Sequence, residues 1–125
     1  MKKLFLITPY TDPYFTRKQR IITEVCLDHD YEMLAGKIPD KNVELTISET
    51  LSILRDTDCL IADLTFERPS CYYELGFIQA LEKKSLIIAS QGTQIHFIQN
   101  RDQVSFYTSM EEYQELIVSF FSSLS

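Results

Sequence analysis

The chain has 125 residues, which is enough for one domain with a real core and little more, so we expect a single domain over residues 1–125. The net charge of −6 argues against a nucleic-acid polymer as the ligand, because binding a phosphate backbone needs a basic surface. The net charge does not exclude a small anionic ligand, because a few local donors can outweigh it. No apolar run approaches the roughly 18 residues of a membrane span, and the first apolar run is shorter than a signal-peptide core. We therefore expect no membrane partner and a cytoplasmic location.

Three cysteines, Cys26, Cys59 and Cys71, are spread along the chain. Their odd number and wide spacing suggest neither a disulfide framework nor a zinc site. The two histidines, His29 and His96, are far apart and lack partners at ligand spacing. The sequence thus predicts no metal and no cofactor.

In the first half of the chain, short apolar runs alternate with a segment whose apolar residues recur at helical spacing. Lys3 to Thr8 predicts a strand that is apolar on both faces, as parallel sheets require. Pro9 to Tyr14, with two prolines, predicts a loop. Phe15 to about Asp28 predicts a helix with apolar residues at helical spacing, leaving residues such as Lys18 for solvent. Tyr31 to Leu34 predicts a short second strand.

The middle of the chain continues the alternation. Asn42 is a good N-cap for a second helix, and Cys59 to Asp63 predicts a third strand. Cys71 to Lys83 predicts a third helix, whose final lysines suit the negative pole of its own dipole. Ser85 to Ala89 predicts a fourth strand.

Toward the end of the chain the pattern weakens. Ile95 to Ile98 and Val104 to Tyr107 are candidate short strands, one of them at an edge. Ser109 is the predicted cap of a final helix, and Glu112 would complete a capping box. Alternating strands and helices with short links predict an α/β fold, in which a mainly parallel sheet of four to five strands carries helices on both faces.

The most informative segment runs from the third predicted strand into the third predicted helix. The apolar run ends in the carboxylate of Asp63, a polar loop with a proline follows, and Glu74 stands in the first turns of the helix. Ligands of open α/β sheets bind at the carboxyl ends of strands. We therefore expect Asp63, Glu74 and the loop Pro9–Tyr14 to line one cleft, where two acids could do glycosidic or acyl chemistry.

Asp63-Leu64-Thr65, the short loop and Tyr72-Tyr73-Glu74-Leu75-Gly76 resemble the core motif of the nucleoside 2-deoxyribosyltransferase-like proteins. The same motif is similar to that of bacterial TIR-like nucleotide-binding domains. The resemblance covers Cys59–Ala89 well. It implies a small flavodoxin-like, three-layer fold in which an acid in this helix attacks or stabilises the ribose carbon of an N-glycosidic bond. The loop departs from the commoner Asn-Pro-Asn, since Arg68-Pro69-Ser70 stands there.

Two acids are the candidate catalytic residues. Glu74 could stabilise positive charge on an anomeric carbon or bond to it covalently, although acids are also favoured in any first helical turn. Asp63 could hold a sugar hydroxyl or protonate the leaving base; its ordinary role would be to cap the loop. Thr65 could bond the ligand or its own loop. Arg68 could meet a phosphate or stay solvated.

The remaining candidate substrate-binding residues stand at the same end of the predicted sheet. Thr8 closes the first strand, and Tyr10 and Tyr14 could stack on a base or pack on their own loop. Asp12, between the two tyrosines, could touch a sugar hydroxyl. Tyr72 and Tyr73 directly precede Glu74, so one of the two should point toward the core and the other toward the cleft or a partner.

Three function classes remain open from the sequence. The favoured one is an enzyme acting on the N-glycosidic bond of a nucleoside, a nucleotide or NAD, by transfer or by hydrolysis. The alternative is a TIR-like domain that cleaves NAD or binds a nucleotide signal without turnover. A response-regulator-like switch is disfavoured because the first strand ends in Thr8-Pro9 rather than in paired acids. A homo-oligomer is expected, since a short domain leaves a ligand half solvated and the resemblance implies sites completed by a neighbouring subunit.

Overall fold

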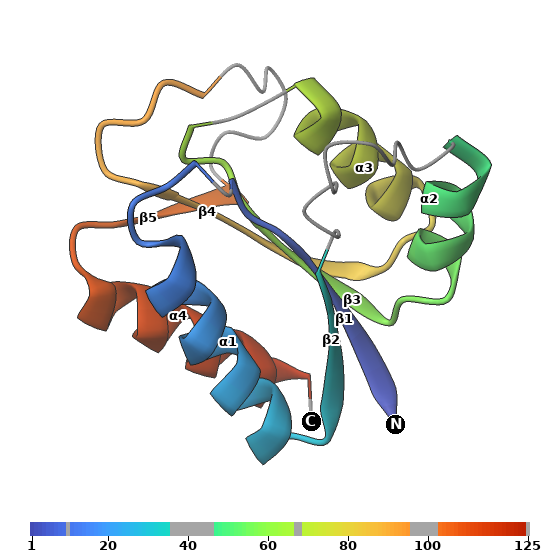
Figure 1. Cartoon of the computed structure of the whole chain (residues 1–125), viewed down its shortest axis with the longest axis horizontal. Coiled ribbons are helices and arrows are strands. Elements are labelled where there is room, and N and C mark those ends of the chain that lie inside the picture. Colours follow the sequence, from blue (N-terminus) through green and yellow to red (C-terminus); the bar gives the residue numbers. More distant parts are fainter. Residues whose placement is uncertain (10, 36–46, 67–68, 96–102, 125) are drawn as a thin grey trace.

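The computed structural model describes residues 1–9, 11–35, 47–66, 69–95 and 103–124 (Figure 1). Its strands are β1 (Lys2–Ile7), β2 (Tyr31–Ala35), β3 (Cys59–Asp63), β4 (Lys84–Ser90) and β5 (Val104–Tyr107), and its helices are α1 (Phe15–Asp28), α2 (Ile47–Arg55), α3 (Pro69–Ala80) and α4 (Met110–Ser123). These described elements alternate along the chain much as the sequence predicts.

The five described strands form one sheet in the order β2-β1-β3-β4-β5, and every neighbouring pair is parallel. This is the flavodoxin-like order. Helices α1 and α4 cover one face of the sheet, and α2 and α3 cover the other (Figure 1). The predicted α/β three-layer sandwich with a parallel sheet is therefore confirmed.

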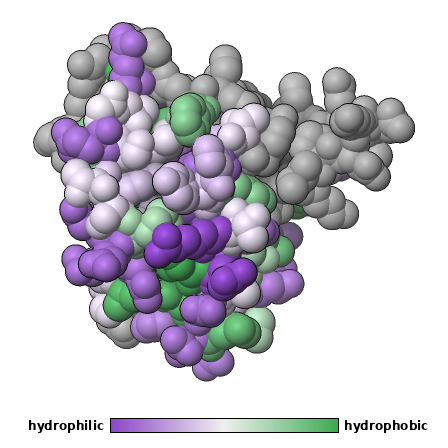
Figure 2. Space-filling view, turned by 60° about the vertical axis from the view of Figure 1, so that its left-hand side comes forward, coloured by the Kyte–Doolittle hydropathy of each residue, from purple (hydrophilic) through white to green (hydrophobic). Residues whose placement is uncertain are grey.

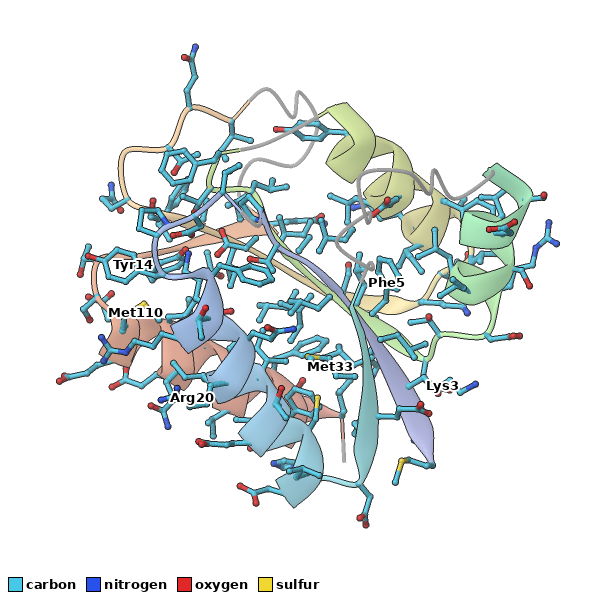
Figure 3. The ribbon with its side chains drawn as sticks, in the orientation of Figure 1. Lys3, Phe5, Tyr14, Arg20, Met33 and Met110 are labelled. Carbon is cyan, nitrogen blue, oxygen red and sulfur yellow. The ribbon has the colours of Figure 1, made fainter. Side chains whose placement is uncertain are left out.

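The core has two halves because side chains of a strand alternate between the faces of a sheet. In β1, Leu4 and Leu6 pack toward α1 and α4, whereas Phe5 and Ile7 pack toward α2 and α3. Figure 3 shows Phe5 pointing to the side of α2 and α3 and Met33 pointing to the side of α1. All of β3 is buried, as expected of a strand covered on both faces.

The outer surface over α1 and α4 is mainly hydrophilic, with apolar side chains showing between the polar ones (Figure 2). None of the helices that the structure describes is long and apolar enough to cross a bilayer.

The third helix ends three residues earlier than predicted. α3 stops at Ala80, and Glu82 takes a left-handed conformation with φ of 57° before β4 begins. Lys83 therefore does not serve the dipole of its own helix. Its Nζ instead donates to the carbonyl of Leu54, at 2.9 Å, and to those of Arg55 and Thr57. Lys83 thus supplies a charged donor to three carbonyls at and just after the end of α2, of which the Leu54 carbonyl also accepts from the Thr57 N–H.

The predicted edge strand and final helix are confirmed. Val104–Tyr107 forms β5 at one edge of the sheet. The Ser109 Oγ accepts from the Glu112 backbone N–H at 3.1 Å and so caps α4. The Glu112 carboxylate accepts from the hydroxyl of Thr108. The predicted N-cap Asn42 and residues 96–98 of the other candidate strand lie outside the described residues.

The contacts of Lys83 predict a specific loss of stability. Lys83→Met should lower the free energy of unfolding by about 1 kcal/mol, because carbonyls at the end of α2 lose a charged donor and the site is partly exposed to water. Lys84→Met is the matched control, since its exposed side chain makes no bond to these carbonyls. Urea unfolding of both variants measures the difference, and equal losses would contradict the capping role.

Candidate active site at the carboxyl edge of the sheet

All described strands run the same way, so their carboxyl ends meet at one edge of the sheet (Figure 1). The strand order reverses between β1 and β3, which is the topological switch point where ligands of such folds bind. The segments that follow β1 and β3 flank this point. Among the described residues, no group of His, Cys, Asp and Glu gathers that could hold a metal ion.

A buried lysine lies directly beneath this edge. Lys18 projects from α1 with 2% of its surface exposed. Its Nζ pairs with the carboxylate of Asp12 and, at 3.0 Å, with Oδ2 of Asp63. The same ammonium donates to the hydroxyl of Tyr107 at 2.6 Å. The expectation that Lys18 faces solvent is wrong, because these three oxygens replace the water it gives up.

Further hydrogen bonds extend this cluster to the other strand ends. The Tyr107 hydroxyl donates to Asp63 Oδ2 at 2.7 Å and contacts Thr65 Oγ1 at 3.1 Å. The Thr65 backbone N–H donates to Asp63 Oδ1 at 3.0 Å, and the Ser90 N–H donates to Thr65 Oγ1 at 2.8 Å. We call Asp12, Lys18, Asp63, Thr65 and Tyr107 the Lys18 network. It ties the ends of β3, β4 and β5 to the loop after β1.

The Lys18 network holds two carboxylates and one ammonium, so it carries one excess negative charge. Burial lowers the pKa of Lys18, but the Asp63 charge and hydrogen bonds to Asp12 and Tyr107 outweigh it and raise the pKa above its usual value. Burial, together with the Asp63 charge, raises the pKa of Tyr107 to about 12. At neutral pH the lysine is charged and the phenol is neutral.

Asp63 does not share a cleft with Glu74 as expected. The Asp63 side chain is 0% exposed and bonds to Lys18 of α1 and Tyr107 of β5, on the α1 and α4 side of the sheet. Glu74 belongs to α3, which packs on the opposite side. The physical reason is strand alternation: Asp63 shares the face of Cys59 and Ile61. The convergence of two acids in one crevice is therefore wrong, and Asp63 holds the edge together from below.

Glu74 lies in the second turn of α3 with a half-buried side chain. Leu75 and Ile78 are fully buried and define the inward face of the helix. Since successive helical residues are about 100° apart, Glu74 stands at the flank between the core and the surface. Tyr72 packs against the core on the α2 and α3 side, as one of the two tyrosines should.

The other predicted binding residues differ in what they can reach. Thr8 is half-buried, and its Oγ1 is buried without a hydrogen-bond partner in the described part of the chain. Asp12 and Thr65 are buried and used within the Lys18 network. Tyr14 is exposed at the start of α1 (Figure 3), and its N–H donates to Asp12. The remaining predicted contacts, Tyr10, Arg68 and the side chain of Tyr73, lie outside the described residues.

Sequence reasoning missed Lys18, Tyr107 and Phe66 as residues of this edge. Lys18 stands four residues before the buried Ile22, so it lies in line with the apolar stripe of α1. Spacing alone predicts that Lys18 points toward the core, whereas its charge predicts that it faces solvent. Tyr107 ends a strand at the same edge as Asp63. Phe66, exposed in the loop after β3, carried no signal beyond its neighbours.

The fold and this edge define a small flavodoxin-like α/β protein with a polar site at its switch point. No family model and no curated protein sequence matches the chain. Among solved structures, the CMP N-glycosidase BcmB of Clostridium botulinum is similar, with a TM-score of 0.66 and 16% identity over 91% of this chain and 96% of that one. A 2-desoxiribosyltransferase from Leishmania mexicana matches with a TM-score of 0.61 and 16% identity, over 95% and 98% of the two chains. These likenesses confirm the fold implied by the sequence resemblance.

Replacing Lys18 should reveal how much burial of the Asp12 and Asp63 carboxylates destabilises the fold. Lys18→Met should lower the free energy of unfolding by about 3–5 kcal/mol, because two acids are then left buried without their cation. Adding Asp12→Asn should restore part of this loss, because one of the stranded charges is removed. Urea unfolding of both single variants and the double variant gives the coupling energy. Strictly additive losses would show that Lys18 and Asp12 are not coupled in the folded protein.

Alkaline pH should weaken the fold. Burial raises the pKa of Cys26 from 9.0 to about 11 and that of Cys59 from 9.0 to about 12. The folded thiols hold their protons more tightly than the unfolded ones, so this contribution is complete below pH 9 and is lost as pH rises toward 12. The urea midpoint should therefore fall between pH 8.5 and 10.5. Cys59→Ala, referenced to its own value at pH 7, should show a smaller fall; an equal fall would reject the assignment.

Proposed function

We propose that the chain acts on the N-glycosidic bond of a nucleoside or nucleotide, with Glu74 as the nucleophile or charge stabiliser. The observation that carries this proposal is a half-buried carboxylate on the helix after β3, next to the switch point of a 2-1-3-4-5 parallel sheet. The sequence motif around Glu74 supports it. So do the two similar structures, a CMP N-glycosidase and a 2-desoxiribosyltransferase, whose folds this chain shares.

The chemistry asks for negative charge near the sugar. Breaking the bond between base and sugar builds positive charge on the anomeric carbon, which a fixed carboxylate can stabilise or capture as a covalent intermediate. Glu74 would supply that carboxylate. The Lys18 network would add one diffuse negative charge from beneath the edge and hold the loops in place. The unpartnered hydroxyl of Thr8 is a candidate contact for the substrate.

Transfer and hydrolysis differ only in what takes the sugar. A second base accepts it in transfer, and water accepts it in hydrolysis. Incubating the protein with a nucleoside or nucleotide, with and without a second base, separates them by chromatography of the products.

Glu74→Gln tests the catalytic role directly. The amide keeps the size and hydrogen bonding of the side chain and removes its negative charge. Base release should fall about a hundredfold or more, because stabilising charge in the transition state is usually the largest catalytic term. Stability should change by about 1 kcal/mol or less, the worth of an acid near a helix N-terminus. Base release by chromatography and melting temperature are the two measurements.

Glu115→Gln on α4 is the matched control, because it removes the same charge from an exposed position on the far side of the sheet. Its base release should equal that of the wild type. An active wild type whose Glu74→Gln variant cleaves at the same rate would overturn the proposed role of Glu74.

We further propose that the protein works as a homo-oligomer through the outer face of α3. Glu74 is the only charged residue within this helix, so the helix is apolar around most of its circumference. Leu75 and Ile78 fill the inward face, whereas Gly76 is exposed and Phe77 is half-buried. A helix that is apolar all round is normally buried on all sides. A second copy of the chain would bury this outer face close to Glu74.

Gly76→Arg should disrupt this assembly without unfolding the chain. A Cβ at Gly76 meets no atom within 4 Å, and arginine favours a helix more than glycine does. Sedimentation should show the wild type associated at micromolar concentration and Gly76→Arg as a monomer of equal or higher melting temperature. A wild type that stays monomeric at high micromolar concentration would reject the oligomer.

A further inference from the structure

Phe66 adopts a conformation that an aromatic residue rarely takes. Its φ is 55°, in the left-handed region, and 59% of the residue's surface is exposed. Only glycine, asparagine and aspartate enter this region readily. The other two described non-glycine residues with positive φ, Asp30 and Glu82, follow the ends of α1 and α3, where left-handed residues commonly terminate helices. Phe66 follows a strand, so helix termination does not account for it.

The segment before Phe66 is fixed from several sides. The Leu64 N–H donates to the Ile88 carbonyl at 2.8 Å. Thr65 is held through its N–H by Asp63 and through its hydroxyl by Tyr107 and the Ser90 N–H. A strained residue persists only where its surroundings over-determine it. These bonds are that constraint, and they direct the chain so that Phe66 emerges at the carboxyl edge beside the switch point.

Burial does not offset this strain, because more than half of the Phe66 residue surface is exposed. A large exposed aromatic side chain held in an unfavourable conformation needs another reason for its position, and strained residues gather at ligand sites. A flat, rigid ring suits a flat ligand. The π-face of a nucleobase can stack on an aromatic side chain without hydrogen-bond readout.

We propose that Phe66 is the stacking platform for the nucleobase of the substrate, held in place by the Lys18 network. The inference rests on the proposed function, because it assigns the base to the loop after β3 and the sugar to the neighbourhood of Glu74. An aromatic ring of this kind can stack on the π-face of any nucleobase. It therefore strengthens binding of the whole substrate, while selection among bases falls to polar groups at the ring edges.

Phe66→Gly separates a ligand-binding role of the ring from a structural role. It should weaken nucleotide binding without lowering the stability of the fold. Glycine adopts positive φ without steric cost, so the melting temperature should stay unchanged or rise by a few degrees. Loss of the ring should weaken binding of nucleoside 5′-monophosphates about tenfold to a hundredfold. Calorimetric titration with the 5′-monophosphates of adenosine, guanosine, cytidine and uridine, and with the four nucleosides, measures the affinity. Phe66→Tyr keeps the ring and should bind within about threefold of the wild type.

Two controls isolate the base. Glu82→Gly relieves the same kind of backbone conformation in the turn before β4, at the opposite edge of the sheet, and should leave affinity unchanged. Ribose 5-phosphate lacks a base, so its affinity should be the same for the wild type and Phe66→Gly. A parallel loss for ribose 5-phosphate would show a general disturbance of the site and overturn the platform.

The results separate this inference from the proposed function. A wild type that releases base, with a Phe66→Gly variant of equal affinity, overturns the platform alone. A wild type that binds nucleotides through Phe66 but releases no base supports the platform and refutes the enzyme. A wild type that binds none of the four nucleotides and none of the four nucleosides overturns both.

Discussion

The buried ammonium of Lys18 is the interaction on which the carboxyl edge of this protein depends. Moving two carboxylates and a lysine out of water costs several kcal/mol for each ion, and their mutual attraction offsets that cost only when the remaining donors and acceptors are also satisfied. Here Tyr107 and the backbone N–H of Thr65 complete the pairing. The main gain is one defined arrangement, since the loops after β1 and β3 meet at the same cation.

In this arrangement the two acids Asp63 and Glu74 lie in different surroundings. Asp63 is one of the two acids that the sequence predicts at the ligand, yet its carboxylate is fully buried and bonded to Lys18. Glu74 stands on the helix of the opposite layer with a half-buried side chain. One carboxylate therefore fixes the arrangement of the strand ends, and the other lies on the helix that follows β3, in the opposite layer.

The sequence predicts the fold well because apolar runs and helical spacing are local signals. The strands around Leu4–Ile7 and Cys59–Asp63 are buried on both faces, and that pattern alone indicates a parallel sheet. The face taken by Asp63 was not predictable from the same pattern, since both sides of the strand are apolar. It follows from the orientation of β3, in which Asp63 points to the same side as Cys59 and Ile61, toward α1 and α4. The burial of Lys18 was not predicted, because a charged side chain is ordinarily exposed to solvent even where its spacing matches the apolar stripe of its helix.

Shared fold at 16% identity leaves function to a few residues in loops. The core of this chain needs only apolar side chains of suitable volume, and many sequences supply them. The loop after β3 is different, because it joins the clamped Thr65, the strained Phe66 and the helix of Glu74 within ten residues. A conformational cost at Phe66 lowers stability, and nothing in the core recovers it. Glycine or asparagine would adopt this conformation at lower cost, and the ring that phenylalanine supplies in their place is what the proposed stacking of a nucleobase uses.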